Sequence, residues 1–223
     1  MKQTAFSSAK FRRIALIALF GALSYVLMLV IHFKISFLTL DLKDTIIALS
    51  GLYFGPLAAL TLSLLVPLLE FITVSDTGVY GLLMNFLGSA AFSVTAAVIY
   101  RYKKSFAGAL IALFSAVAAL VAVMLTFNLL VTPHYMGVTV AEVQALIPTL
   151  LLPFNLIKAI LNMGFVLLFY KPISTVMQRM GLIEKSTRPQ GFHRRSVVMI
   201  LIALALIAVS FAVIFGILGG RLG

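Results

Sequence analysis

The chain has 223 residues, of which 62% are hydrophobic and only 10% are charged, and its mean hydropathy is +1.16. Soluble domains carry about 25% charged residues, so the composition predicts an all-α integral membrane protein with several spans. The net charge of +11 does not indicate nucleic-acid binding, because the basic residues flank apolar runs, where they act as topology signals. The absence of cysteine excludes disulfides, thiolate metal sites and a cysteine nucleophile.

The first predicted helix covers residues 14–31 and follows a basic N-terminal cluster. The run is long and lacks a small-x-small cleavage site, so we interpret it as a retained helix and not as a signal peptide. Ala15, Ala18 and Ala22 form a strip of small side chains, which suits close contact between helices. The strip is a candidate surface for a partner subunit. Packing within the chain is the alternative, and spacing alone does not separate the two.

The first loop, residues 34–44, has alternating apolar residues that an exposed loop would not need. We expect it to fold back over a pocket as a lid and to offer backbone groups to a ligand. Its candidate ligand-binding residues are Thr39, Leu40 and Asp41. Asp44 is predicted to be the N-cap of the next helix.

The apolar stretch 45–73 is too long for one span, because it would measure roughly 43 Å against a hydrocarbon core of about 30 Å. Gly55-Pro56 is the natural break and gives two short helices. Two helices here also bring the basic residues 101–104 to the side of the N-terminal cluster, as the positive-inside rule requires. Glu70 is the only carboxylate in an apolar run, and a solvated helix end explains it as well as a binding role does.

The next two predicted helices cover residues 80–100 and 106–131. On the first, Asn85 begins a polar stripe at four-residue spacing that suits either a ligand or helix packing. On the second, Asn128 lies near the outer end. Its carboxamide both donates and accepts, so it can bind the edge of a heterocycle, and an interhelical hydrogen bond is the alternative. Tyr135 follows and could form part of a pocket wall.

Lys158 lies near the middle of the apolar run 148–170, within a predicted helix over residues 148–176. A lysine at the bilayer centre costs roughly 2.5 to 3.5 kcal/mol, so such residues usually face a bundle interior or a cavity. Asn155 and Asn162 share its helical face, and prolines break the outer end of the helix. The pattern predicts the wall of a ligand pocket. A lysine whose head reaches the interface is the alternative.

A basic segment follows, and then a seventh apolar run at 197–218. We divide the chain into a six-helix binding domain (1–179), a basic cytoplasmic linker (180–196) and an extra transmembrane helix (197–223). This last helix is predicted to be a lipid-facing anchor that takes no part in ligand binding and leaves the C-terminus outside.

The sequence has no P-loop, no paired carboxylates and no nucleophile motif, so we expect a binder and not an enzyme, with energy supplied by partners. The three histidines have no carboxylate partners at ligand spacing, so no metal site is expected.

Several segments together resemble the substrate-binding S component of an energy-coupling-factor (ECF) vitamin transporter, and the riboflavin-specific branch in particular. The segments are the Ala18-xxx-Ala22 strip, Leu40-Asp41-Leu42-Lys43-Asp44, Phe54-Gly55-Pro56-Leu57-Ala58, Met84-Asn85-Phe86-Leu87 and Pro153-Phe154-Asn155-Leu156-Ile157-Lys158. They span most of residues 10–177, and the proline-to-lysine segment is the most specific.

The resemblance implies six helices, an external vitamin pocket closed by the first loop, and a complex with a coupling subunit and two cytoplasmic ATPases in a prokaryotic cell membrane, with the N-terminus cytoplasmic. It implies that Ala18 and Ala22 face the coupling subunit and that Asn128 and Lys158 hold the vitamin. Riboflavin would then be bound as cargo, with no cofactor. An S component for another vitamin or for flavin mononucleotide, a stand-alone carrier and a membrane enzyme are the alternatives.

Overall fold

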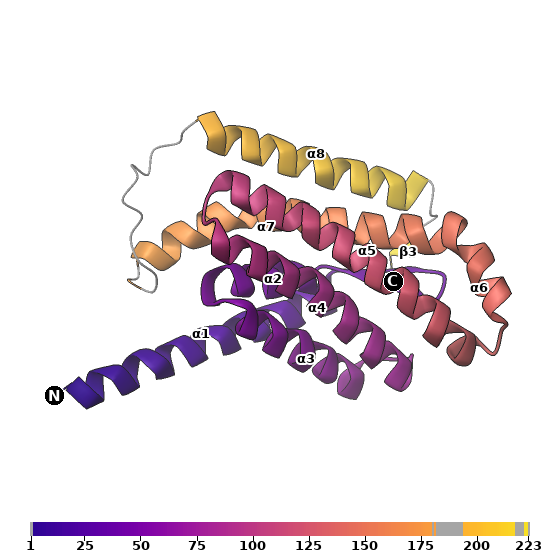
Figure 1. Cartoon of the computed structure of the whole chain (residues 1–223), viewed down its shortest axis with the longest axis horizontal. Coiled ribbons are helices and arrows are strands. Elements are labelled where there is room, and N and C mark those ends of the chain that lie inside the picture. Colours follow the sequence, from indigo (N-terminus) through magenta and orange to yellow (C-terminus); the bar gives the residue numbers. More distant parts are fainter. Residues whose placement is uncertain (1, 180, 182–193, 217–220, 223) are drawn as a thin grey trace.

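The computed structural model describes residues 2–179, 181, 194–216 and 221–222. Within these residues the chain forms a bundle of helices running side by side, with a small sheet at one end (Figure 1). The predicted all-α membrane fold is confirmed: the six core helices are α1, α2, α3, α4, α5 and α7, and α8 is the seventh. Of these seven described helices, all but α2 are long and apolar enough to cross a membrane. Most of the predicted linker 180–196 lies outside the described residues.

Helix α1 (Lys2–Val30) is followed by α2 (Lys43–Phe54) and α3 (Pro56–Thr73). The predicted break between the last two is confirmed. Gly55 has a φ of 96°, a conformation that glycine adopts without cost, and Pro56 then starts α3. Every residue of α2 except Tyr53 is buried, so this 12-residue helix lies inside the bundle and not in lipid.

The first loop forms a β-hairpin that the sequence analysis did not predict. Strand β1 (His32–Ile35) pairs antiparallel with β2 (Leu38–Asp41), in a register that sets His32 opposite Asp41. A two-residue turn, Ser36-Phe37, joins the strands, and Ser36 has a φ of 57°. The alternating apolar residues of this loop therefore reflect strand periodicity.

Helices α4 (Gly78–Tyr102) and α5 (Phe106–Met136) pack against each other, and α5 leads into the short α6 (Val140–Leu146). A π-helical segment, η1 (Ile147–Leu151), joins α6 to α7 (Leu152–Arg179). The predicted break at the two prolines is thus a π turn. Proline has no N–H to donate, and segments of this type often mark functional sites.

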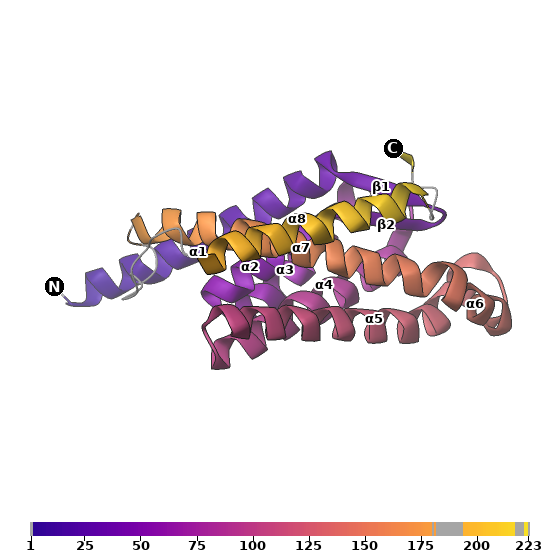
Figure 2. The ribbon, with the colours of Figure 1, turned by 90° about the horizontal axis from the view of Figure 1, so that it is seen from above.

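Helix α8 (Arg194–Gly216) packs along α7, and β3 (Arg221–Leu222) joins the hairpin in a sheet of order β2-β1-β3. The N-terminus lies at one end of the bundle together with the last turn of α7 and the first of α8. The sheet and the C-terminal end lie near the opposite end (Figures 1 and 2).

Candidate functional site

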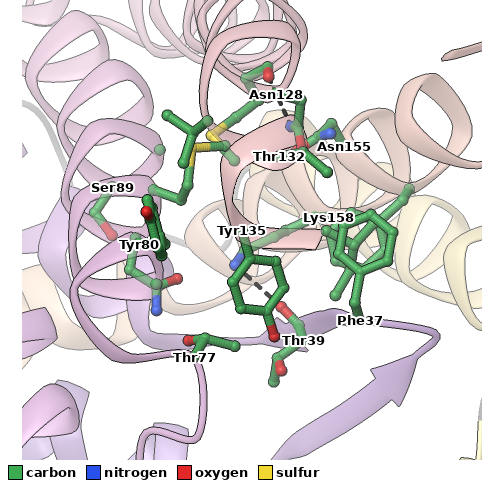
Figure 3. Close-up of a pocket in the computed structure, with 18 of the residues that line it drawn as sticks. Phe37, Thr39, Thr77, Tyr80, Ser89, Asn128, Thr132, Tyr135, Asn155 and Lys158 are labelled. Atoms are coloured by element: carbon green, nitrogen blue, oxygen red, sulfur yellow. Dashed lines mark hydrogen bonds between the residues drawn. The ribbon is translucent and has the colours of Figure 1, made fainter. Parts of the chain in front are cut away.

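A pocket of about 730 Å³, including its open mouth, lies between the hairpin and helices α4, α5 and α7. Its walls carry apolar and aromatic side chains: Phe37, Leu38, Tyr80, Met84, Leu120, Met124, Val131, Tyr135 and Phe154. Its polar lining includes Thr39, Asp44, Asn85, Ser89, Asn128, Thr132, Asn155 and Lys158. Figure 3 shows these groups converging from the hairpin and the three helices.

Lys158 reaches into this pocket from α7 (Figure 3). Its Nζ lies 3.1 Å from Asp41 Oδ2 and 3.4 Å from the carbonyl oxygen of Thr39. The residue is only 9% exposed, so the alternative of a lysine that reaches the interface is wrong. An ammonium group has three N–H donors, and two of them have partners among the described residues.

A chain of charges runs from Lys158 to the outer part of α3. Asp41 Oδ2 also accepts from Lys43 Nζ at 3.0 Å, and this Nζ lies 2.8 Å from Glu70 Oε2. Glu70 Oε1 in turn accepts from Asn85 Nδ2 at 3.0 Å. Glu70 is therefore not a solvated helix end, because it pairs with a fully buried lysine.

Asp41 lies outside the membrane-spanning helices but is itself fully buried, 1% exposed. Burial alone would raise the pKa of this carboxyl, but the charges of Lys158 and Lys43 and their hydrogen bonds outweigh burial and lower the pKa below its usual range. Asp41 thus stays ionised and anchors both lysines.

The predicted capping role of Asp44 is wrong. The N-cap of α2 is Leu42, which makes no side-chain cap, and Asp41 Oδ1 accepts the backbone N–H of Lys43 at 3.0 Å. Asp44 lies one turn further on, where its carboxylate lines the pocket and accepts from Ser89. The carboxylate that accepts a backbone N–H at the start of α2 is therefore that of Asp41, three residues before the predicted Asp44.

Asn155 lines the pocket, and one of the two polar atoms of its side-chain amide makes no hydrogen bond within the described residues. Its Nδ2 donates to the carbonyl of Leu151 at 2.7 Å, whereas its buried Oδ1 has no hydrogen-bond partner among the described residues. Leaving a buried acceptor unpaired costs free energy unless another molecule supplies a donor. Asn155 Oδ1, although buried, is therefore an acceptor in the pocket wall that an N–H or O–H group of another molecule could satisfy.

Asn128 also lines the pocket, but both ends of its amide are engaged within α5. Nδ2 donates to the carbonyl of Met124 at 2.7 Å, and Oδ1 accepts from Thr132 at 2.9 Å (Figure 3). A carbonyl oxygen has two lone pairs, so Oδ1 can accept one more donor. The interhelical bond considered as the alternative does not form between described residues.

Three residues expected at the ligand are absent from the pocket lining: Leu40, Asp41 and, from the polar face of α7, Asn162. Asp41 is buried and pairs with Lys158 and Lys43 instead of facing the pocket. The side chain of Leu40 is fully buried in a core cluster with Phe154, Ile157 and Leu161, and it is absent from the pocket lining. Strand β2 holds it in the protein core, where an apolar side chain is best accommodated. Asn162 is also absent from the lining: it accepts from Thr45 Oγ1 at 2.8 Å and donates to the carbonyl of Asp41, so it fixes the hairpin to α7.

The other predicted residues lie where the sequence suggested. Thr39, Asn85 and Tyr135 line the pocket, and Tyr135 packs edge-on against Tyr80 with ring centroids 6.0 Å apart. Met84, Met124 and Thr132 complete the lining but were not singled out from the sequence. Lys43 was also missed, although Glu70, as a lone carboxylate in an apolar run, signalled the need for a cation.

The small-residue strip of α1 lies on the surface of the bundle. Ala15, Ala18 and Ala22 are all exposed, whereas Phe20 and Ser24 on the other side of the helix are buried. Packing of the strip within the chain is therefore wrong. Among the residues that the structure describes, no group of three or more metal-ligating side chains could hold a metal ion.

Comparisons with known proteins agree with this geometry. The model of the family "ECF transporter, substrate-specific component" matches residues 12–174. The riboflavin transporter RibU of Staphylococcus aureus is 29% identical over 177 residues, which cover 75% of this chain and 93% of the relative. A solved structure described as the S component of a bacterial ECF transporter superposes with a TM-score of 0.66 at 29% identity, covering 76% of this chain and 99% of that one. The chain therefore belongs to the family of substrate-specific components of ECF transporters, as a multi-pass protein of a prokaryotic cell membrane.

Proposed function

We propose that this chain is the riboflavin-binding subunit of an ECF-type importer and that it works with a transmembrane coupling subunit and two cytoplasmic ATPases. The observation that carries the proposal is the pairing of a donor and an acceptor on α7, inside a pocket with aromatic and apolar walls. Lys158 has one N–H without a partner among the described residues, and Asn155 has an unused buried oxygen.

Riboflavin fits both features. Its flat ring system is largely apolar, and the imide edge of the ring offers an N–H between two carbonyl oxygens. A lysine donor and an amide acceptor one helical turn apart complement such an edge. The ring suits walls made of Phe37, Tyr135 and methionine side chains, and the polyol tail would find hydroxyl and amide partners among the polar lining.

The charges around the pocket favour riboflavin over flavin mononucleotide. Lys158 and Lys43 face three carboxylates, those of Asp41, Asp44 and Glu70. Lys158 is already paired with Asp41, so it does not require an anionic ligand. A phosphate dianion would enter a cluster in which negative groups are the majority, and its desolvation would not be repaid by a free cation.

The similarity to a protein named as a riboflavin transporter supports the same ligand. For the partner, the exposed strip Ala15, Ala18 and Ala22 supports docking of a coupling subunit, because small side chains let two helices approach closely in lipid. The chain would then contribute binding, and its partners would contribute ATP hydrolysis. Riboflavin is cargo in this scheme, and the N-terminus is cytoplasmic.

The test is to purify the protein from cells grown with riboflavin and to record its absorbance, followed by titration of the ligand-free protein with riboflavin. We expect flavin bands near one equivalent, and we expect affinity to fall strongly in Lys158→Ala and Asn128→Ala. Lys103→Ala, at an exposed lysine between α4 and α5, is the control and should bind as wild type does. A protein that neither carries flavin nor binds added riboflavin would refute the proposal.

The role of partners is tested separately by uptake of labelled riboflavin into cells. Uptake should require co-expression of the coupling subunit and both ATPases. Uptake by the chain alone in proteoliposomes would favour a stand-alone carrier.

A further inference from the structure

The C-terminal strand β3 completes the sheet that contains the hairpin. It pairs antiparallel with β1, with Leu222 opposite Phe33 and Arg221 opposite Lys34. Without β3, strand β1 would be an edge strand with unpaired backbone groups. A lone two-stranded hairpin with four residues in each strand is marginally stable at best, so the third strand matters for its position.

The outer end of α8 packs on the same strand. The rings of Phe211 and Phe33 lie 6.0 Å apart at 82°, an edge-to-face contact, and Ile214 is fully buried in the core cluster that includes Phe33. Helix α8 in turn is held close to α7 at Gly164, where an added Cβ would lie 2.9 Å from Ile207 Cγ1. Figure 2 shows the far end of α8 lying beside β1 and β2.

The hairpin held in this way carries part of the binding site. The carbonyl of Thr39 accepts from Lys158, and Phe37 and Leu38 form part of the pocket wall. The family model ends at residue 174, so α8 and β3 lie beyond the segment that defines the family. They were predicted to be an anchor without a part in binding, yet they contact the strand next to the ligand-facing one.

We propose that Phe211 and β3 are positioning elements of the hairpin, and that this C-terminal segment slows the entry and the exit of the ligand by holding the hairpin over the pocket. They act through β1 and do not touch the ligand. The contacts of β1 with β3 and Phe211 lie away from the ligand-facing strand β2, so we expect them in both the empty and the occupied protein. Loosening them should therefore raise both rate constants and change the affinity less. The kinetic part rests on the proposed function, because riboflavin is the probe.

The first test needs no ligand. Hydrogen exchange is measured in the hairpin, residues 32–41, for the full chain, for a chain ending at Gly216 that lacks β3, and for Phe211→Ala. Leu204→Ala is the matched control, since Leu204 lies on the same helix but is 49% exposed. We expect exchange in the hairpin to accelerate about tenfold in the shortened chain, which loses one or two net hydrogen bonds, and in Phe211→Ala, which loses an aromatic contact of about the same size, with α4 and α5 unchanged. Exchange that is equal in all four proteins would overturn the proposal.

The second test measures riboflavin association and dissociation by stopped-flow quenching of flavin fluorescence. In the shortened chain and in Phe211→Ala, both rate constants should rise about tenfold with a smaller change in Kd. Faster dissociation alone would show damage to the pocket and would contradict the positioning role. If the full chain binds no riboflavin, the proposed function fails, whereas the exchange experiment still decides whether the C-terminal segment holds the hairpin.

Discussion

Asp41 is the residue whose removal tests the electrostatics of the pocket most directly. Its carboxylate lies 3.1 Å from Lys158 Nζ and 3.0 Å from Lys43 Nζ. In Asp41→Asn, Lys43 keeps Glu70 at 2.8 Å, but Lys158 loses its carboxylate partner. The neutral amide preserves the shape of the side chain, so the substitution isolates the charge.

The size of the effect follows from the pairing. Removing one partner of a buried ion pair typically costs about 3 to 5 kcal/mol. We therefore expect Asp41→Asn to lose about 4 kcal/mol of folding stability, which corresponds to a fall in Tm of roughly 10 °C for a chain of this size.

Asp44→Asn is the matched control, because it removes a charge from the same cluster without separating a lysine from its partner. Asp44 accepts from Ser89, and an asparagine oxygen can do the same. We expect Asp44→Asn to lower Tm far less than Asp41→Asn. The assay is thermal unfolding of the detergent-purified, ligand-free proteins, followed by riboflavin titration. Equal losses in the two variants would refute the reasoning, because stability would then depend on the number of carboxylates and not on the pairing of Lys158.

The pH dependence supplies a second check on Asp41. Its pKa in the folded protein is lowered by the two lysines, so its contribution is present above the unfolded pKa of about 3.9 and is lost as pH falls through the lower folded value. The stability difference between wild type and Asp41→Asn should therefore be constant near neutral pH and shrink in strong acid. A difference that grows on acidification would contradict the assignment.

Three further predictions concern the ligand, the partner and the hairpin. Asn155→Ala should weaken riboflavin binding about tenfold in titrations with little change in Tm, because its free oxygen serves the ligand; unchanged affinity would remove Asn155 from the site. Ala18→Leu and Ala22→Leu should abolish uptake in cells while purified protein binds riboflavin normally, and lost binding would mean damage to the bundle. Asp76→Asn should speed riboflavin dissociation less than about fivefold, because the 2.7 Å ion pair of Asp76 with Lys34 of the hairpin is exposed, and a larger effect at neutral pH would contradict this weak pairing. The hydrogen bond and charge of Lys34 lower the Asp76 pKa, so the dissociation rate of the wild type should approach that of the variant as pH falls below about 4.

The sequence was sufficient to predict the features that depend on residues close together in the chain. Gly55-Pro56 breaks a run that is too long for one span, and Lys158 is too costly in lipid to face anything but a cavity. The small residues around Ala18 could likewise be identified along one helix face, but their spacing left open whether they meet a partner or pack within the chain, and only the family resemblance pointed to a partner.

Pairing across long sequence separations was harder to predict. The partner of Lys158 lies 117 residues away, and the outer loops offered Asp41 and Asp44 within three residues of each other. Both could cap α2 or balance the lysine, and only the register of β2 decides which does. Strand β3 has two residues, too short for any periodic pattern to indicate it.

The buried pair of Lys158 and Asp41 is difficult to explain as a device for stability. Apolar residues of similar volume often replace a buried ion pair with no loss or with a gain in stability, because two charges must be desolvated. Here both charges lie where the hairpin meets α7, and the lysine, which lines the pocket, keeps one donor without a partner among the described residues. A ligand oxygen that takes this donor binds a lysine whose position is already fixed by Asp41 and by the Thr39 carbonyl of the hairpin. In the proposed site, affinity for the ligand would therefore depend on how Asp41 and the hairpin hold this ammonium group, so Lys158→Met with Asp41→Asn should recover much of the lost Tm without recovering riboflavin binding.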